Sequence, residues 1–200
     1  GQEKLKEFLE KIGILGQLNF DIKEIGKPLS FKWRECKLKT VSYGHGITTT
    51  PIQLAKGYAI LANGGFDINP TLIKKKINNI KKKRILKKDV SSKLNKIFRK
   101  VVTQGTATLS DVEGYEVGGK TGTAQIVENG NYTKKKINTF ASVFPSSDPK
   151  YVLVILLEDT KLSKDYVYKY RNKPGSYKGT PFNTAGWTSV EITGKILDKI

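Results

Sequence analysis

The chain has 200 residues, of which 38% are hydrophobic, and its 36 Lys and Arg against 18 Asp and Glu give a formal net charge of +18. This composition allows a domain with a hydrophobic core, and no apolar run approaches the roughly 20 residues that a helix needs to cross a bilayer. A single cysteine, Cys36, excludes an internal disulfide and a thiolate metal cluster, and a single histidine, His45, excludes a metal site built from histidines.

The first half of the chain predicts helices separated by irregular structure. Residues 2–12 carry apolar side chains at helical spacing, up to a stop at Gly13. The chain contains no methionine and starts directly in this helix pattern, so we expect it to be a piece of a longer product. Residues 14–50 predict irregular structure. The run Thr50-Pro51-Ile52-Gln53 is a capping box with proline at the first helical position, and it predicts a helix that ends before Asn63.

A third helix and a sheet are predicted next. Apolar side chains recur at helical spacing from Val90 to Val101, and Gly105 is a suitable stop. The period then changes, and residues 120–127, 137–144 and 151–157 predict three consecutive antiparallel strands. The third of these is unbroken in its apolar character, so we expect it to be buried on both faces.

Residues 160–182 are polar and rich in tyrosine, proline and glycine, which predicts a long surface loop, and residues 190–200 predict a final helix. No internal repeat and no clear linker interrupts the chain. We therefore expect residues 1–200 to form one portion of a domain without an internal boundary.

The positive charge raises nucleic acid as a possible partner. Its densest cluster is Lys74–Lys88, where apolar residues alternate with lysines in a pattern typical of a solvated ribbon. The charge is otherwise spread along the chain and consists mostly of lysine. A basic nucleic-acid-binding module therefore stays an alternative hypothesis, and we expect no nucleic-acid partner.

The most informative stretch is Gly119-Lys120-Thr121-Gly122-Thr123, which fits two different patterns. K-T-G is a motif of serine acyl-transfer sites of the penicillin-binding type. The longer run Gly114–Thr121 also fits G-x-x-x-x-G-K-[ST], the phosphate-binding P-loop. A P-loop needs a helix directly after its Lys-Thr, whereas here Gly122 and a strand-like sequence follow.

In an acyl-transfer site, each residue of the motif has a chemical role. Lys120 supplies a positive charge beside the nucleophile and the substrate's carboxylate, and Thr121 and Thr123 offer hydroxyls to that carboxylate. Gly122 lets the acyl group lie against the strand. The N–H of Thr123 is a candidate oxyanion donor, a role worth on the order of 3–4 kcal/mol.

The chain resembles the class B penicillin-binding proteins, and specifically the septal (division-type) transpeptidases, because several blocks come in that family's order and cover nearly its whole length. These blocks are Ser42–Ile47 with Thr50–Leu54, Tyr58–Gly65, Val101–Ala107, Gly119–Gln125, Phe140–Pro145 with Pro149–Val152, and Thr184–Trp187.

The resemblance implies an α+β fold, the serine β-lactamase-like fold of penicillin-binding transpeptidases, with an antiparallel sheet flanked by helices and an incomplete N-terminal half. It implies a peptidoglycan D,D-transpeptidase that cross-links stem peptides ending in D-Ala-D-Ala through a serine acyl-enzyme, with β-lactams as covalent inhibitors. It also implies a septal glycan polymerase and division proteins as partners. An N-terminal anchor in the cytoplasmic membrane, absent here, would leave the catalytic domain on the periplasmic side. No cofactor or metal is implied.

Two motifs of the family are missing from these residues. No S-x-N occurs, and the one S-x-x-K, Ser147-Asp148-Pro149-Lys150, falls in a predicted turn where Pro149 disfavours a helix. We therefore expect the nucleophilic serine to lie upstream in a parent polypeptide and the 200 residues alone to be inactive. The candidate site residues in this chain are Lys120, Thr121, Gly122 and Thr123.

Overall fold

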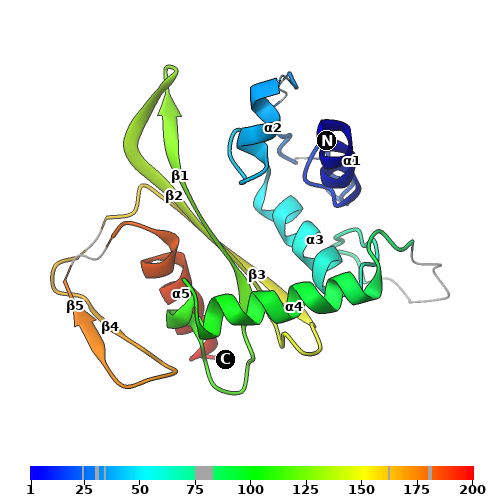
Figure 1. Ribbon diagram of the computed structural model, residues 1–200. Helices are drawn as coiled ribbons and strands as arrows, with labels where there is room; N and C mark the ends of the chain where they lie inside the picture. Colours follow the sequence, from blue (N-terminus) through cyan, green and yellow to red (C-terminus); the bar gives the residue numbers. More distant parts are fainter. Residues whose placement is uncertain (24, 30–31, 34, 75–82, 162, 180–181) are drawn as a thin grey trace. The chain divides into compact units, whose positions relative to one another are not determined.

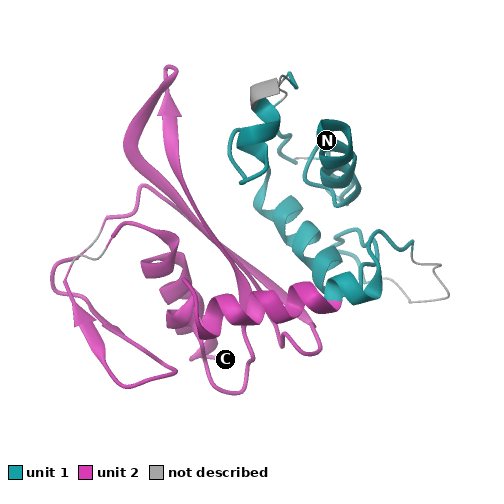
Figure 2. Ribbon diagram, in the orientation of Figure 1, with its two compact units in different colours: residues 1–91 teal, residues 92–200 magenta. Residues whose placement is uncertain are grey.

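The computed structural model describes residues 1–23, 25–29, 32–33, 35–74, 83–161, 163–179 and 182–200 (Figure 1). These residues divide into two compact units, Gly1–Ser91 and Ser92–Ile200 (Figure 2), and each is described by itself. The expectation of one portion without an internal boundary stays a prediction. Among the helices that the structure describes, none combines the length and apolar character that crossing a membrane requires.

The described residues of the first unit include the helices α1 (Gln2–Lys11), α2 (Glu35–Val41) and α3 (Pro51–Ala62). Its core gathers around Ile12, Ile14 and Ile60, which are 0–7% exposed. The prediction of irregular structure throughout residues 14–50 was wrong at α2. This helix has only seven residues, too few to establish an apolar period.

The capping box at the start of α3 is confirmed. The Thr50 hydroxyl accepts a hydrogen bond from the Gln53 backbone N–H at 3.3 Å, and the Gln53 side-chain carbonyl accepts one from Thr50 N–H at 3.2 Å. Later in this unit an antiparallel bridge joins Phe66 and Arg84. Most of the Lys74–Lys88 cluster, residues 75–82, lies outside the described residues.

The second unit is built on a three-stranded antiparallel sheet in the order β1-β2-β3, as predicted. Its strands are β1 (Gly118–Glu128), β2 (Asn131–Phe144) and β3 (Tyr151–Glu158). The expectation that the third strand is buried on both faces was wrong. Within the described residues β3 pairs only with β2, and Leu156 is 43% exposed. The central strand is β2, whose last five residues are all buried.

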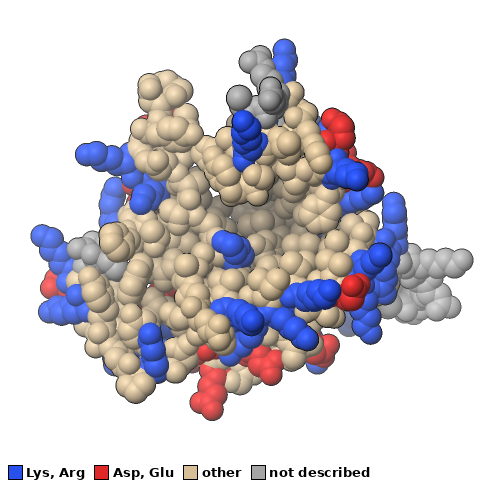
Figure 3. Space-filling model, viewed as in Figure 1, with Lys and Arg blue, Asp and Glu red and all other residues tan. Residues whose placement is uncertain are grey.

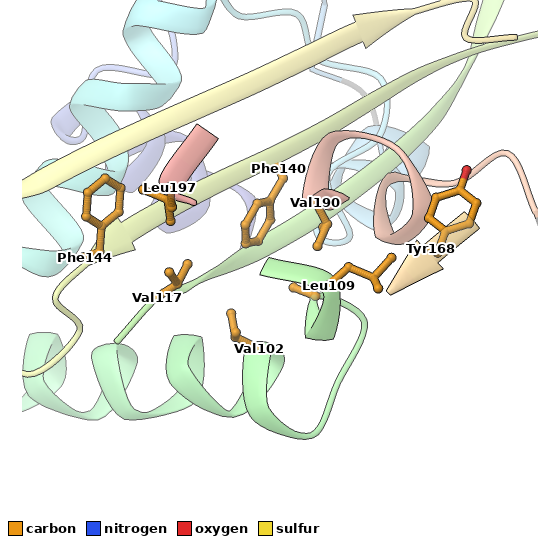
Figure 4. Packing of buried hydrophobic residues seen from close by; sticks show 9 residues of the cluster. Val102, Leu109, Val117, Phe140, Phe144, Tyr168, Val190 and Leu197 are labelled. Atoms are coloured by element: carbon orange, nitrogen blue, oxygen red, sulfur yellow. The ribbon is translucent and has the colours of Figure 1, made fainter. Parts of the chain in front are cut away.

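Helices α4 (Lys88–Thr103) and α5 (Ser189–Leu197) confirm two predicted helices. Of the apolar side chains predicted at helical spacing in α4, Phe98 is buried but Ile97 is 55% exposed, and the buried Val102 lies one residue beyond the predicted range. Figure 4 shows side chains from α4, the sheet and α5 meeting in one core. The core residues are Val102, Ala107, Leu109, Val117, Phe140, Phe144, Tyr168, Val190 and Leu197.

The predicted surface loop at residues 160–182 contains a hairpin. Strands β4 (Val167–Lys169) and β5 (Ser176–Lys178) pair antiparallel, and Tyr168 is only 5% exposed because it reaches the core. Two 3₁₀ turns complete the unit, η1 (Thr108–Ser110) and η2 (Ala185–Trp187). The hairpin was missed because each strand has only three residues.

Candidate active site

Gly118 and Gly119 allow the start of β1 to pack closely against its neighbours. A Cβ at Gly119 would lie 2.4 Å from the carbonyl oxygen of Ala141, a distance that no side chain tolerates. A Cβ at Gly118 would lie 3.1 Å from backbone atoms of Phe98 and Arg99 on α4. The pair of glycines therefore lets the start of β1 lie close to both β2 and α4. Lys120 is the next residue along this strand.

The residues of the Lys-Thr-Gly-Thr motif form strand, not loop and helix. Lys120 pairs with Ala141 and Thr123 with Asn138 in the antiparallel register of β1 and β2, which continues to Gln125. A P-loop requires a helix N-terminus at this point, because its backbone N–H groups hold the phosphate. The P-loop hypothesis for Gly114–Thr121 is therefore wrong.

One face of β1 lines a cavity of about 340 Å³ that we call the threonine pocket. Thr121 and Thr123 share this face because alternate residues of a strand point the same way. The Thr121 hydroxyl lies 2.8 Å from the Thr106 hydroxyl. The lining residues are Gly105, Thr106, Thr108, Leu109, Thr121, Thr123, Tyr170, Thr184, Gly186 and Trp187.

Lys120 does not line this pocket and belongs to the opposite face of the strand. Its side chain is exposed, and its ammonium donates a hydrogen bond to the carbonyl oxygen of Thr121 at 2.8 Å. Gly122 lies on the same face as Lys120, and a Cβ built there would meet no heavy atom within 4 Å. The structure thus leaves open space over Gly122, beside the one lysine of the motif.

The Thr123 hydroxyl is already engaged by the protein. It donates to the Asn138 side-chain carbonyl at 3.2 Å and accepts from the backbone N–H of Ala185 at 3.0 Å. Its only hydrogen is therefore directed at Asn138, which competes with the expected donation to a substrate carboxylate. The Thr121 hydroxyl bonds instead to the Thr106 hydroxyl in the pocket.

From the sequence, we assigned no function in the site to Asn138 or to residues Thr184–Trp187. Asn138 is fully buried, and it occupies the strand face shared with Phe140 and Phe144. The available signal was a polar residue two positions before Phe140 on a strand face that leads into the core. Its hydrogen bond with Thr123 depends on the register of the β1–β2 hairpin, which cannot be derived from the sequence.

The S-x-x-K sequence at Ser147 is confirmed as part of a turn between β2 and β3. Ser147 donates a hydrogen bond to the Glu116 carboxylate, and Lys150 pairs with Asp148 at 3.4 Å. Because the lysine is committed to the aspartate and no helix holds it beside Ser147, this serine lacks the arrangement that activates a nucleophile. In the part of the chain that the structure describes, no group of three or more His, Cys, Asp and Glu could hold a metal ion.

The antiparallel sheet and the helices packed against it give the second unit an α+β fold. The chain superposes with a TM-score of 0.79 on the transpeptidase domain of penicillin-binding protein 3 from Burkholderia pseudomallei, at 22% identity, covering 98% of this chain and 56% of that one. Residues 1–178 match the model of the penicillin-binding protein transpeptidase domain. The chain belongs to this family.

Named relatives agree with this assignment. The chain is 27% identical over 214 residues to the probable peptidoglycan D,D-transpeptidase FtsI of Caulobacter vibrioides, covering 100% of this chain and 34% of the relative. It is 30% identical over 176 residues to stage V sporulation protein D of Bacillus subtilis, covering 80% of this chain and 27% of the relative. The chain thus spans about a third of the length of the curated relatives it matches.

Proposed function

We propose that this chain supplies the Lys120–Thr123 wall of the active site of a peptidoglycan D,D-transpeptidase. The observation that carries the proposal is the Lys-Thr-Gly-Thr strand itself. It lies at an edge of the sheet, with the Lys120 ammonium held at the Thr121 carbonyl oxygen and open space over Gly122. A positive charge beside an accessible strand edge suits a peptide that ends in a carboxylate.

The direction of the backbone groups supports this role. In an antiparallel strand, neighbouring residues direct their N–H and C=O groups alternately toward and away from the paired strand. Because the Thr121 carbonyl accepts from the Lys120 side chain, Thr121 belongs to the outward set. Thr123 lies two residues later and shares that direction, so its N–H is available as an oxyanion donor for an acyl group lying over Gly122.

The proposed reaction proceeds in two steps through a serine that lies elsewhere in the parent polypeptide. The serine oxygen attacks the penultimate D-Ala carbonyl of a stem peptide, and the terminal D-Ala leaves with the proton. An amine of a neighbouring stem peptide then attacks the acyl-enzyme, which forms the cross-link and frees the serine. A β-lactam enters the first step and remains bound, because its ring opens without releasing a leaving group.

We propose a septal setting for this activity, because the ordered motifs of the chain resemble division-type members of the family. The parent protein would be anchored in the cytoplasmic membrane with this portion on the periplasmic side. A septal glycan polymerase and division proteins would be its partners. The relatives' names support the peptidoglycan substrate, since one of them is a probable peptidoglycan D,D-transpeptidase.

The proposal is tested by incubating the complete parent protein with a synthetic stem peptide ending in D-Ala-D-Ala and a D-amino acid acceptor. We expect release of one D-Ala for each acceptor incorporated, and β-lactam should stop both. A folded parent protein that releases no D-Ala under conditions where a known transpeptidase does would contradict the proposed reaction.

A further inference from the structure

Asn138 lies at the centre of a hydrogen-bonded relay behind the Lys-Thr-Gly-Thr strand. Its side-chain carbonyl accepts from the Thr123 hydroxyl at 3.2 Å, and its amide donates to the Asn183 side-chain carbonyl at 2.6 Å. The Asn183 amide in turn donates to the backbone carbonyl of Thr160 at 3.1 Å. One buried side chain therefore joins β1 to two segments that are distant in sequence.

The relay also fixes one wall of the threonine pocket. The Thr123 hydroxyl accepts from the Ala185 N–H at 3.0 Å, so the segment that carries Gly186 and Trp187 is tied to the motif strand. A Cβ at Gly186 would lie 2.7 Å from the Thr106 carbonyl oxygen, which shows how closely this wall approaches its neighbour.

The burial of Asn138 makes the loss of its hydrogen bonds costly. Asn138 is 0% exposed, so bulk water does not satisfy its hydrogen-bonding groups and its partners come from the protein. Removing the side chain would leave the Thr123 hydroxyl and the Asn183 side-chain carbonyl to find new partners in the interior, where an unsatisfied polar group is costly. We expect β1 and the Ala185 segment to shift relative to each other in response.

We propose that Asn138 is a positioning residue, which holds Thr123 and the Thr184–Trp187 segment in the geometry that acyl transfer requires. The inference rests on the proposed function, because its effect is exerted on the Thr123 N–H that we assign to the oxyanion. Asn138 does not touch the substrate and acts through the hydroxyl of Thr123.

The first test compares Asn138→Ala with Ser142→Ala in the complete parent protein. Ser142 is a matched control because it is also 0% exposed, lies four residues along the same face of β2, and bonds to the Leu153 carbonyl oxygen rather than to the motif. The measured quantity is the acylation rate constant at saturating penicillin. This constant does not depend on the fraction of folded protein, so a loss of stability alone leaves it unchanged.

We expect Asn138→Ala to lower this rate constant roughly tenfold, the effect of a donor misaligned rather than removed. Ser142→Ala should leave it within about twofold of the wild type, because it touches neither Thr123 nor Ala185. Equal rate constants for Asn138→Ala and the wild type would overturn the positioning role.

The second test is a double-mutant cycle with Thr123→Val. If Asn138 acts through the Thr123 hydroxyl, the double variant should be no slower than the slower single variant, because both changes cut the same relay. Independent effects that multiply to roughly a hundredfold would overturn the inference. Thr123→Ser keeps a hydroxyl and should restore the sensitivity to Asn138→Ala.

Amide hydrogen exchange at Ala185 separates this inference from the proposed function. We expect faster exchange of the Ala185 N–H in Asn138→Ala and unchanged exchange in Ser142→Ala. A wild-type parent protein that takes up no penicillin would overturn the proposed function and the positioning role with it. If the wild type is acylated but the Ala185 N–H exchanges at the same rate in Asn138→Ala, the positioning role alone is overturned.

Discussion

Lys120 is the residue on which the proposed chemistry depends most. Its side chain is exposed, and its ammonium bonds to a backbone carbonyl oxygen, which carries no net charge to neutralise it. We expect Lys120→Ala in the complete protein to reduce acylation by penicillin roughly a hundredfold or more, because a fixed charge at developing negative charge is removed. Stopped-flow or gel-based measurement with a fluorescent penicillin checks this.

Lys134→Ala is the matched control for Lys120→Ala. Lys134 is an exposed lysine on β2 of the same hairpin, outside the motif. Lys134→Ala should leave acylation unchanged, since the exposed charge that it removes lies outside the motif and is screened by salt. Retained labelling of Lys120→Ala at the level of Lys134→Ala would contradict the role of Lys120.

Thr123 is the second residue whose role can be separated by substitution. Thr123→Val preserves the shape of the side chain but leaves the Ala185 N–H and the Asn138 carbonyl without their shared hydroxyl. We expect acylation efficiency to fall roughly tenfold, the cost of leaving a buried polar group unpaired. Thr123→Ser should stay close to the wild type, and equal acylation kinetics of all three proteins would count against any role of this hydroxyl.

At the scale of elements, Arg171 ties the β4–β5 hairpin to the core of the second unit. The Arg171 guanidinium donates to the Glu191 carboxylate at 3.0 Å and to the Asp198 carboxylate at 2.7 Å, and it also bonds to the Leu109 carbonyl oxygen. Although burial disfavours the charged guanidinium, its bonds to these two carboxylates raise the pKa of Arg171 overall. The neighbouring Tyr170 lines the threonine pocket, so the clamp supports a wall of the site.

We expect Arg171→Gln to destabilise the protein by about 3 kcal/mol, because it leaves the Glu191 carboxylate buried without its cation. Glu191 is only 8% exposed at its side chain. Arg171→Lys should not restore stability, since a single ammonium cannot reach the separate partners of the planar guanidinium. Chemical denaturation of the complete protein measures this, with the exposed Lys178→Gln as control. Equal stabilities of Arg171→Gln and Lys178→Gln would show that the clamp is dispensable.

The sequence correctly predicted those helices and strands whose position is determined by local residue patterns. The capping box fixed the start of α3, and the change from helical to alternating period located the three strands of the sheet. The short α2 and the β4–β5 hairpin were missed because three to seven residues cannot display a period. The burial of β3 was misjudged because an apolar run does not state which neighbours cover it.

The candidate site was predictable only as a motif. The order Lys-Thr-Gly-Thr predicts acyl-transfer chemistry, and the structure places it on β1, within the range where the sequence predicted a strand. The occupation of the Thr123 hydroxyl was not predictable. Its partners Asn138 and Ala185 lie 15 and 62 residues away, and only the hairpin register and the path of the chain bring them together.

For the molecule as a whole, the positive charge does not define the site. Lys and Arg side chains lie at many separate places on the face viewed in Figure 3, with uncharged surface between them. The expectation of no nucleic-acid partner stays a prediction. It is the specific chemistry of one strand, rather than the charge of +18, that supports the proposed function.

The central claim is that this chain forms part of an enzyme that is acylated on serine through its Lys-Thr-Gly-Thr strand. The most direct measurement is the intact mass of the complete parent protein before and after incubation with benzylpenicillin, followed by peptide mapping. The account predicts one covalent penicilloyl group per polypeptide, on a serine outside these 200 residues. A folded parent protein whose mass does not change, or an adduct on Ser147, would contradict it.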